Sequence, residues 1–179
     1  MKLFISINIS EDLKEESAIL QAKLKKFNDV NISPKENLHI TLKFIGETNN
    51  LEEIITKLDK IEFKEFTMTS AGAGFFPDEN NIRIAWIGFK PCEELILLRG
   101  KICDYLGRQF KDELKFVPHL TIARMKRILP NEKKAIKEVQ NTIIKKIEFK
   151  IDAFNLMESE LSSKGPKYRS IKEFKAKSL

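Results

Sequence analysis

Two histidines are the residues of this sequence whose type and spacing point most directly to chemistry. The chain has two histidines in all, and each begins the pattern His, apolar, Thr, apolar, as His39-Ile-Thr-Leu42 and as His119-Leu-Thr-Ile122. Histidine gains or loses a proton near neutral pH, because its unperturbed pKa is about 6.5. A pair of histidines can therefore supply the base and the acid of one reaction, such as the cleavage of a phosphodiester.

The threonine of each pattern is placed to assist its histidine. Successive side chains of a strand point to opposite faces, so His39 and Thr41 are expected to share a face, as are His119 and Thr121. The apolar residues between them are then expected to face a core. A threonine hydroxyl can donate a hydrogen bond to a non-bridging phosphate oxygen and stabilise its charge. Two such pairs that face each other would form a site for in-line displacement at phosphorus.

Two cations near the patterns are further candidates for phosphate contacts. Arg124 follows His119 by five residues, and a guanidinium pairs well with phosphate. Strict alternation places Arg124 on the face opposite His119, so it needs a bulge, a strand end or a long reach to take part. Lys43 is expected on the His39 face, although Ala123 stands at the matching place of the second pattern. The alternative for Arg124 is an ordinary surface arginine.

Each pattern also has alternative interpretations. A single His-x-Thr has little specificity, and a lone histidine on a strand is more often structural. A zinc site would need a third and a fourth ligand. Cys92 and Cys103 lack ligand spacing to the histidines and form no disulfide framework. We therefore expect neither a metal nor another cofactor.

The histidine patterns lie in alternating stretches that are rich in β-branched and aromatic residues, which predicts strands. We expect strands over residues 3–9, 37–46, 62–70, 82–89, 116–124, 147–156 and 168–174. Apolar residues at helical spacing predict helices over residues 11–27, 51–58, 91–110 and 130–144. Ser10 is the expected N-cap of the first helix. Gly72 and Gly74 are expected to break the strand pattern that precedes them.

Most aromatic side chains are expected to pack in the core. The strand positions that suggest this are those of Phe44, Phe63, Trp86 and Phe149. Phe75 and Phe76 follow a glycine-rich stretch and are expected to fill the junction of two lobes, with stacking on a nucleobase as the alternative.

An internal repeat relates the two halves of the chain. Each histidine pattern is followed by a predicted helix and then by the same five residues, first as Lys60-Ile-Glu-Phe-Lys64 and then as Lys146-Ile-Glu-Phe-Lys150. A duplicated lobe would place both histidines about a pseudo-two-fold axis, where they could face a shared cleft. We expect one domain over residues 1–179.

Composition adds broad limits. The net charge of +6 favours a polyanionic partner, although basic composition alone is weak support. The apolar start of the chain is short and alternates, unlike a signal peptide, and no stretch is long enough to span a bilayer. We expect a cytoplasmic monomer with no membrane partner.

These residues resemble the 2H phosphoesterase superfamily, and within it the bacterial and archaeal RNA 2′,3′-cyclic phosphodiesterases, historically called 2′-5′ RNA ligases. The resemblance covers nearly the whole chain. Besides the paired motifs it is carried by Met1-Lys-Leu-Phe-Ile-Ser-Ile7, Glu36-Asn-Leu-His-Ile-Thr-Leu-Lys-Phe-Ile-Gly46, Gly74-Phe-Phe-Pro77, Arg83-Ile-Ala-Trp-Ile-Gly88, Pro118-His-Leu-Thr-Ile-Ala-Arg124 and Leu156-Met-Glu-Ser159.

The resemblance implies a bilobal α+β fold, in which each lobe has an antiparallel sheet flanked by helices and the active-site cleft lies between them. It implies that His39 is the proton donor and His119 the proton acceptor, and that Thr41, Thr121 and Arg124 hold the phosphate. Water would attack an RNA 2′,3′-cyclic phosphate in line, and the 3′ oxygen would leave. The two motifs are symmetric, so the sequence alone allows the donor and the acceptor to be exchanged.

Three other functions remain open from the sequence. A 2′-5′ RNA ligase acting on tRNA halves would use the same site in reverse, and tRNA fragments are also among the candidate substrates for hydrolysis. A non-catalytic module that binds RNA ends would not need a matched acid and base. A metal-dependent phosphoesterase would lose its activity in EDTA.

Overall fold

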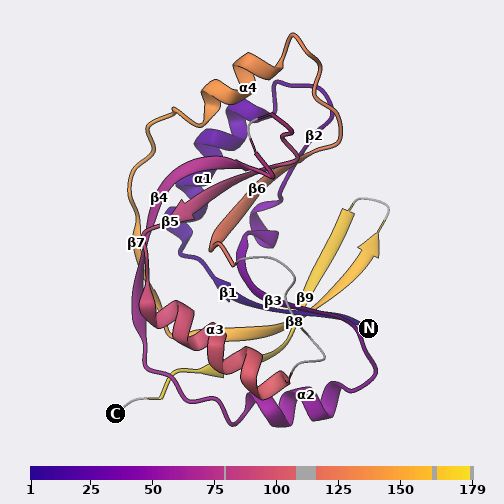
Figure 1. Cartoon of the computed structure of the whole chain (residues 1–179), viewed down its shortest axis with the longest axis vertical. Coiled ribbons are helices and arrows are strands. Elements are labelled where there is room, and N and C mark those ends of the chain that lie inside the picture. Colours follow the sequence, from indigo (N-terminus) through magenta and orange to yellow (C-terminus); the bar gives the residue numbers. More distant parts are fainter. Residues whose placement is uncertain (79, 108–115, 163–164, 178–179) are drawn as a thin grey trace.

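The computed structural model describes residues 1–78, 80–107, 116–162 and 165–177, and over these residues it shows an α+β fold built on one large sheet (Figure 1). The strands are β1 (Lys2–Asn8), β2 (Val30–Ile32), β3 (His39–Glu47), β4 (Phe66–Phe76), β5 (Ile84–Phe89), β6 (His119–Met125), β7 (Glu148–Ile151), β8 (Ala153–Ser162) and β9 (Gly165–Lys175). The helices are α1 (Glu11–Leu24), α2 (Leu51–Leu58), α3 (Glu93–Leu106) and α4 (Lys133–Val139), with a 3-10 helix over Lys35–Asn37.

The order of the strands divides the sheet into two matching halves. The order is β7-β4-β5-β6-β3-β1-β8-β9, and β2 adds to β6. One half therefore consists of β3, β1, β8 and β9, and the other of β6, β5, β4 and β7. The strands pair antiparallel, and the halves join where β3 meets β6 at the pair Ile40 and Leu120. The predicted fold class is confirmed, with the histidine strands at the centre of the sheet.

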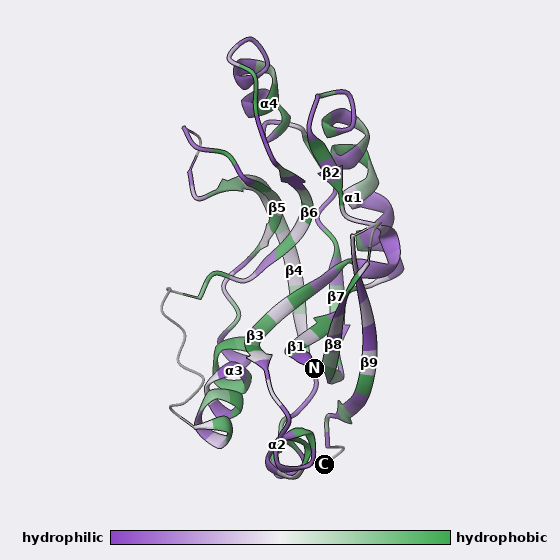
Figure 2. Cartoon of the chain, turned by 90° about the vertical axis from the view of Figure 1, so that its right-hand side faces the viewer, coloured by the Kyte–Doolittle hydropathy of each residue, from purple (hydrophilic) through white to green (hydrophobic). Residues whose placement is uncertain are grey.

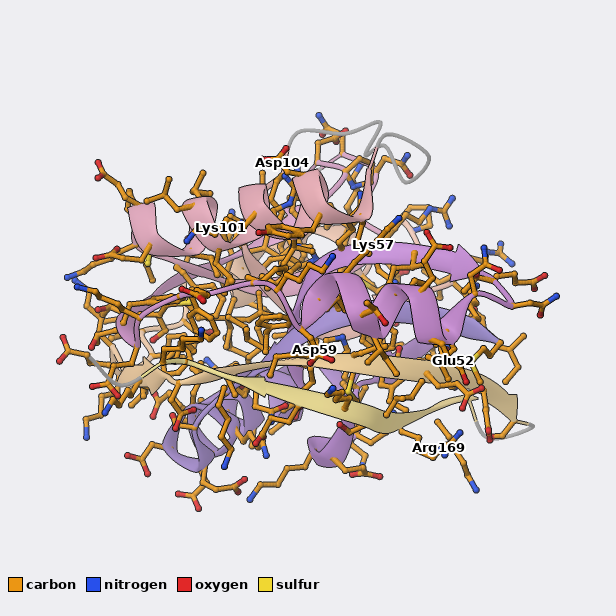
Figure 3. All side chains as sticks on the ribbon, turned by 90° about the horizontal axis from the view of Figure 1, so that it is seen from below. Glu52, Lys57, Asp59, Lys101, Asp104 and Arg169 are labelled. Carbon is orange, nitrogen blue, oxygen red and sulfur yellow. The ribbon has the colours of Figure 1, made fainter. Side chains whose placement is uncertain are left out.

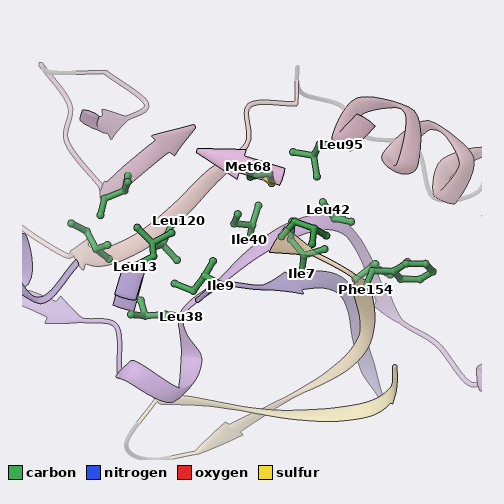
Figure 4. Packing of buried hydrophobic residues seen from close by; sticks show 14 of the residues in the cluster. Ile7, Ile9, Leu13, Leu38, Ile40, Leu42, Met68, Leu95, Leu120 and Phe154 are labelled. Atoms are coloured by element: carbon green, nitrogen blue, oxygen red, sulfur yellow. The ribbon is translucent and has the colours of Figure 1, made fainter. Parts of the chain in front are cut away.

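Two helices tie the halves together across this junction. The chain enters α1 from β1, yet α1 contacts β6 of the other half, and α3 follows β5 yet contacts β3. Ser10 begins α1 as predicted, since its hydroxyl accepts a hydrogen bond from the Leu13 amide at 3.3 Å. Figure 4 shows Leu13 of α1 and Leu95 of α3 in the same apolar cluster as Ile40 and Leu120. The core thus lies on the helix side of the sheet and leaves the other face to the histidines.

A β-bulge interrupts each histidine strand at the same place. Between β1 and β3 the register passes from Ile5–Lys43 to Ser6–Thr41 and leaves out Leu42. Between β5 and β6 it passes from Ala85–Ala123 to Trp86–Thr121 and leaves out Ile122. A bulge places two consecutive residues against one partner residue and shifts the alternation of the strand. The burial patterns of β3 and β6 agree residue for residue over seven positions, with two buried residues in a row at each bulge.

The side chains that follow the bulges show the consequence. On β3, Leu42 and Lys43 are both buried and Phe44 is 66% exposed. On β6, Ile122 and Ala123 are both buried and Arg124 is exposed. The bulges therefore turn Lys43 and Ala123 toward the helices. Phe44 and Arg124 then lie on the face of the sheet that carries the histidines.

Several predicted element boundaries were wrong. Strand β4 runs through Gly72 and Gly74 instead of ending there, because the indole ring of Trp86 lies directly over Gly74 and takes up the space of a side chain. The stretch predicted as one strand over residues 147–156 is divided between β7 and β8. Strand β2 was missed and α4 is shorter than predicted, while residues 108–110 of the third predicted helix lie outside the described residues.

Of the aromatic residues that were predicted to lie in the core, some are buried and others are not. Phe63 and Phe149 are buried as predicted, at 8% and 6% exposure. Trp86 is half-buried on the face that carries the histidines. Phe44 is exposed, so the predicted core position of Phe44 was wrong.

The edge strand β9 is largely hydrophilic (Figure 2), which suits a strand with one unpaired side. Lys172 of β9 pairs with Asp59 at the end of α2 at 2.7 Å, and Lys177 pairs with Glu62. Figure 3 shows Asp59 beside the ribbon of β9. Exposed pairs of this kind are screened by solvent and contribute little, so the buried Leu58 matters more to the packing of α2. No helix in the described ranges is long and apolar enough to cross a membrane.

Replacement of Gly74 by alanine tests the packing beside the site. The new Cβ would overlap Cζ2 of Trp86, so the indole ring must move. We expect Gly74→Ala to lower the free energy of unfolding by about 1–3 kcal/mol, as other overpacked positions do. The matched control is Gly100→Ala on α3, where a Cβ meets nothing within 4 Å, and where alanine is expected to stabilise the helix by about 0.5–1 kcal/mol. Thermal unfolding followed by circular dichroism measures both, and equal midpoints would contradict the account of Trp86.

Candidate active site

The register of β3 and β6 brings the two histidine patterns together. Ile40 pairs with Leu120, and in an antiparallel pair a step forward on one strand matches a step back on the other. His39 therefore lies across from Thr121, and Thr41 across from His119. Ile40 and Leu120 are fully buried on the helix side, so these four polar residues occupy the opposite face. We call this surface the histidine face.

His39 is held by hydrogen bonds at both ring nitrogens. Its Nδ1 lies 2.7 Å from the carbonyl oxygen of Asn37, and its Nε2 lies 3.0 Å from Oγ1 of Thr41. A carbonyl oxygen can only accept, so Nδ1 carries a proton and the neutral ring presents Nε2 as its basic nitrogen. The threonine hydroxyl can donate to that nitrogen. The ring nitrogen of His39 that can gain or give a proton is therefore Nε2, which the Thr41 hydroxyl orients.

His119 is oriented by the same device. Its Nδ1 lies 2.7 Å from the carbonyl oxygen of Val117, which again stands two residues before the histidine. The proton is fixed on Nδ1, and Nε2 is left to accept or give a proton. Both histidines thus present the same nitrogen, as the symmetry of the two motifs requires.

Aromatic rings fix the planes of both imidazoles. On one side, Phe4 of β1 and Tyr168 of β9 approach His39 with centroid distances of 5.0 and 5.2 Å, the tyrosine nearly perpendicular to the imidazole at 87°. On the other side, Phe76 meets His119 at 4.9 Å and 88° and packs against Trp86 at 5.0 Å. Edge-to-face contacts of this kind favour one ring orientation.

The sequence interpretation missed Phe4 and Tyr168 as neighbours of the site. The signal for Phe4 was available, since strand alternation places it on the face opposite Leu3 and Ile5. Phe4 is also buried there, at 3% exposure. Tyr168 comes from the far end of the chain, and no local pattern links it to His39. Phe76 was expected at the junction of the lobes, and it lies beside His119.

Arg124 reaches the histidine face through the bulge at Ile122. Its positive charge lowers the pKa of His39 and also that of His119, so it lies close enough to act on both rings. Of the three routes open to it from the sequence, the bulge is the one that the fold uses. The structure therefore brings together five of the six predicted site residues: His39, Thr41, His119, Thr121 and Arg124.

Lys43 does not join them. The bulge at Leu42 turns Lys43 to the helix side, where it is 2% exposed, and burial lowers its pKa. Two side chains of α3 also act on this pKa: Cys103 raises it and Arg99 lowers it. The expectation that Lys43 shares a face with His39, and so contacts phosphate, was wrong because it assumed unbroken alternation.

The protonation of the two histidines depends mainly on burial. Burial is the largest cause that lowers the pKa of each, because a charged imidazolium loses hydration there. The carbonyl oxygens of Asn37 and Val117 act in the opposite direction. The charge of His119 further lowers the pKa of His39, so the two rings resist being charged at the same time. The arrangement favours states with at most one imidazolium.

No group of three or more His, Cys, Asp or Glu side chains that could hold a metal ion occurs in the part of the chain that the structure describes. What the site does hold is two imidazole Nε2 atoms, two threonine hydroxyls and one guanidinium on one face. This set can bind a phosphate oxygen and move protons on both sides of a phosphorus atom.

Comparison with known families finds the same duplication. A model of LigT-like phosphoesterases matches the chain twice, over residues 7–86 and over residues 89–168. Each matched segment contains one His-x-Thr motif, and the division between the segments falls within β5. The repeat inferred from the histidines is thus also a repeat of the family model.

Individual relatives match over nearly their whole length. The RNA 2′,3′-cyclic phosphodiesterase of Methanocaldococcus jannaschii is 37% identical and covers 97% of this chain and 100% of its own. That of Archaeoglobus fulgidus is 30% identical and covers 97% and 99%.

Solved structures agree on the fold. A crystal structure of a protein from Thermus thermophilus has a TM-score of 0.82 at 25% identity and covers 98% of this chain and 97% of its own. Escherichia coli LigT in its apo form has a TM-score of 0.77 at 21% identity and covers 99% and 98%.

Proposed function

The chain belongs to the LigT-like phosphoesterase family, and on that basis we propose that it hydrolyses the 2′,3′-cyclic phosphate ends of RNA to 2′-phosphate ends. The observation that carries the proposal is the pair of imidazoles whose Nδ1 atoms are both held by backbone carbonyl oxygens, so that both rings present Nε2 for proton transfer across a pseudo-two-fold axis. Relatives that are 30% and 37% identical over nearly the whole chain are RNA 2′,3′-cyclic phosphodiesterases. The proposed enzyme needs no metal, because the two histidines supply both the base and the acid.

The reaction follows from the positions of the two Nε2 atoms. His119 accepts a proton from water as its oxygen forms a bond to phosphorus. The bond from phosphorus to the 3′ oxygen breaks on the opposite side, and protonated His39 gives its Nε2 proton to that oxygen. The product carries a 2′-phosphate and a free 3′ hydroxyl. After turnover the proton on His119 must return to His39, through solvent, before the next cycle.

The remaining groups stabilise the charge on phosphorus. Thr41 and Thr121 donate hydroxyl hydrogen bonds to non-bridging oxygens, and Arg124 pairs with the same oxygens through its guanidinium. The near-symmetry of the motifs does not decide which histidine is the donor. The assignment of His39 as donor follows the resemblance to the 2H phosphoesterases.

The proposed partner is RNA that ends in a 2′,3′-cyclic phosphate, with tRNA fragments among the candidates. The net charge of +6 favours such a polyanion. Within the described residues neither Cys92 nor Cys103 forms a disulfide, as is usual in a reducing compartment. We accordingly propose a cytoplasmic monomer that acts without a cofactor.

A time course with two matched RNAs tests the function. One oligonucleotide ends in a 2′,3′-cyclic phosphate and the other, of the same sequence, ends in a linear 3′-phosphate, and both are incubated in EDTA. We expect loss of the cyclic end only, with the linear end unchanged. Parallel incubation with tRNA halves separates the alternative, since a 2′-5′ joined product without hydrolysis would favour a ligase. Binding of the cyclic end without turnover would indicate a module that only binds RNA ends.

The pH dependence follows from the lowered pKa values of both histidines. The active form has one charged and one neutral ring, and burial and Arg124 hold the pKa of each free-enzyme histidine below its ordinary value. The alkaline limb of kcat/KM should therefore begin below about pH 6.5. A bound phosphate anion favours the imidazolium and raises the pKa values of both histidines. The bell-shaped pH profile of kcat should therefore be centred at higher pH than that of kcat/KM. Profiles measured from pH 5 to 9 test this, and flat profiles would contradict paired-histidine catalysis.

A further inference from the structure

Each of the two β-bulges is held by the side chain of a helix. At the bulge of β6, Nε2 of Gln21 lies 3.0 Å from the carbonyl oxygen of Ile122. At the bulge of β3, Nε of Arg99 lies 3.1 Å from the carbonyl oxygen of Leu42. In both cases the acceptor belongs to the residue that the register leaves out. The same contact therefore occurs at the same place in both halves.

Gln21 and Arg99 belong to the helices that cross from one half to the other. Helix α1 follows β1 and contacts β6, whereas α3 follows β5 and contacts β3. Gln21 stands ten residues after the first residue of α1, and Arg99 six residues after that of α3. The difference of four residues is about one turn, so the two side chains lie on corresponding faces of their helices. A donor to the bulge carbonyl thus recurs in both halves, although its residue type differs.

The amide of Gln21 joins three segments at the bulge of β6. Its Nε2 also lies 2.8 Å from the carbonyl oxygen of Ser33, which follows β2. Both neighbours are carbonyl oxygens, which only accept, so the amide nitrogen donates to both of them. The carbonyl oxygen of Ile122 also accepts a hydrogen bond from the backbone amide of Ser33 at 3.0 Å. Gln21 therefore ties α1 and the end of β2 to the bulged residue.

Arg124 is the site residue whose direction depends on this bulge. It comes two residues after Ile122, and Ala123 between them is buried on the helix side. Side chains alternate along a strand, so β6 without its bulge would turn Arg124 toward the helices and away from the phosphate site. The histidine and the threonine of β6 precede the bulge, so their face does not depend on it.

We propose that Gln21 is a positioning residue of the active site, which holds the bulge of β6 and so keeps the guanidinium of Arg124 on the histidine face. This inference rests on the proposed function, in which Arg124 pairs with the phosphate oxygens. Gln21 lies with α1 on the helix side of the sheet, so it acts through the strand and does not touch the substrate. Its counterpart Arg99 holds the bulge that directs Phe44, which carries no charge.

The test replaces Gln21 by methionine, which keeps the length of the side chain and a high helix propensity but has no donor. The control is Ser17→Ala, one turn earlier on α1, which removes the buried hydrogen bond from Oγ of Ser17 to the carbonyl oxygen of Leu13 at 2.6 Å. With a nucleoside 2′,3′-cyclic phosphate, we expect Gln21→Met to lower kcat/KM by roughly 10- to 100-fold, and Ser17→Ala to leave it within about threefold. Gln21→Lys keeps a donor and should lose less than Gln21→Met. An equal loss in both would count against the hydrogen bond.

Two further readouts separate positioning from a general loss of stability. Added to Arg124→Ala, Gln21→Met should cost little more, because both variants remove the same contact with phosphate. The second readout is the pKa of each histidine, followed by proton nuclear magnetic resonance of the imidazole rings. The charge of Arg124 lowers the pKa of both His39 and His119, so Gln21→Met should raise both values. Ser17→Ala should leave both unchanged.

Additive losses from Gln21→Met and Arg124→Ala would overturn the proposal, as would unchanged pKa values of both histidines in a folded Gln21→Met. The titration of the histidines does not depend on turnover. If the wild type opens no cyclic phosphate, the proposed function fails, but raised pKa values in Gln21→Met would still support the positioning of Arg124. Values equal to those of Ser17→Ala would reject it.

Discussion

Alanine in place of His119 is expected to lower kcat by roughly 10²–10⁴-fold, and alanine in place of His39 by a similar factor. Each variant removes one of the two groups whose Nε2 transfers a proton at phosphorus. Neither histidine is a core residue, since both are half-buried beside the outward face of β3 and β6, so the fold should persist. Steady-state kinetics with an RNA oligonucleotide that ends in a cyclic phosphate measures the loss.

The double variant distinguishes a catalytic pair from two separate contributions. If the histidines act as one unit, loss of the second adds little to loss of the first. We therefore expect the double variant to be about as slow as the slower single variant. Near-ultraviolet circular dichroism serves as the control for folding. A single variant that folds normally and keeps near-wild-type activity would remove that histidine from the mechanism.

Loss of the Arg124 side chain is the second large effect. We expect Arg124→Ala to lower kcat/KM by roughly 10²–10³-fold, comparable to removal of one oxyanion contact in other enzymes. Arg124→Lys should recover part of the activity, because it keeps the charge but loses the paired donors of the guanidinium. The control is Arg127→Ala, three residues further on and also exposed, with a nucleoside 2′,3′-cyclic phosphate as substrate.

A second readout separates a role in the site from a structural one. The charge of Arg124 lowers the pKa of both histidines, so its removal should raise both pKa values. The kcat/KM profile of Arg124→Ala should therefore move to higher pH, while that of Arg127→Ala should not. An unchanged profile together with wild-type kcat/KM would mean that Arg124 does not act on the phosphate site.

The sequence predicted the centre of the site because its signal there is local. Period-2 alternation in the two His-x-Thr patterns places His39 with Thr41 and His119 with Thr121, and the structure has both pairs on the face opposite the buried Ile40 and Leu120. The repeat of the motif predicted two related halves, and the order of strands around β3 and β6 has that symmetry.

The β-bulges explain why Lys43 and Phe44 were placed wrongly. They also show how Arg124 reaches the histidines. Alternation continued past Leu42 placed Lys43 on the histidine face and Phe44 in the core, and both placements were wrong because the strand has an extra residue there. The same extra residue at Ile122 brings Arg124 to the histidines. A bulge is decided by pairing with the neighbouring strand, and the sequence of one strand does not show it.

Long-range packing accounts for the other errors. Gly72 and Gly74 resembled a break in the pattern, whereas Gly74 is the place where the ring of Trp86 crosses β4. Tyr168 reaches His39 from β9, at the other end of the chain, through contacts that only the folded sheet creates. Local periodicity carries no information about either contact.

The most direct test of the central claim is the position of phosphate in the product. An RNA oligonucleotide that ends in a 2′,3′-cyclic phosphate is incubated with the enzyme in EDTA, and the product is examined by ³¹P nuclear magnetic resonance. Acid–base catalysis by His39 and His119 predicts a single 2′-phosphomonoester, formed at the same rate with or without the chelator. A cyclic phosphate that persists, or one that opens only when a metal ion is restored, would contradict it.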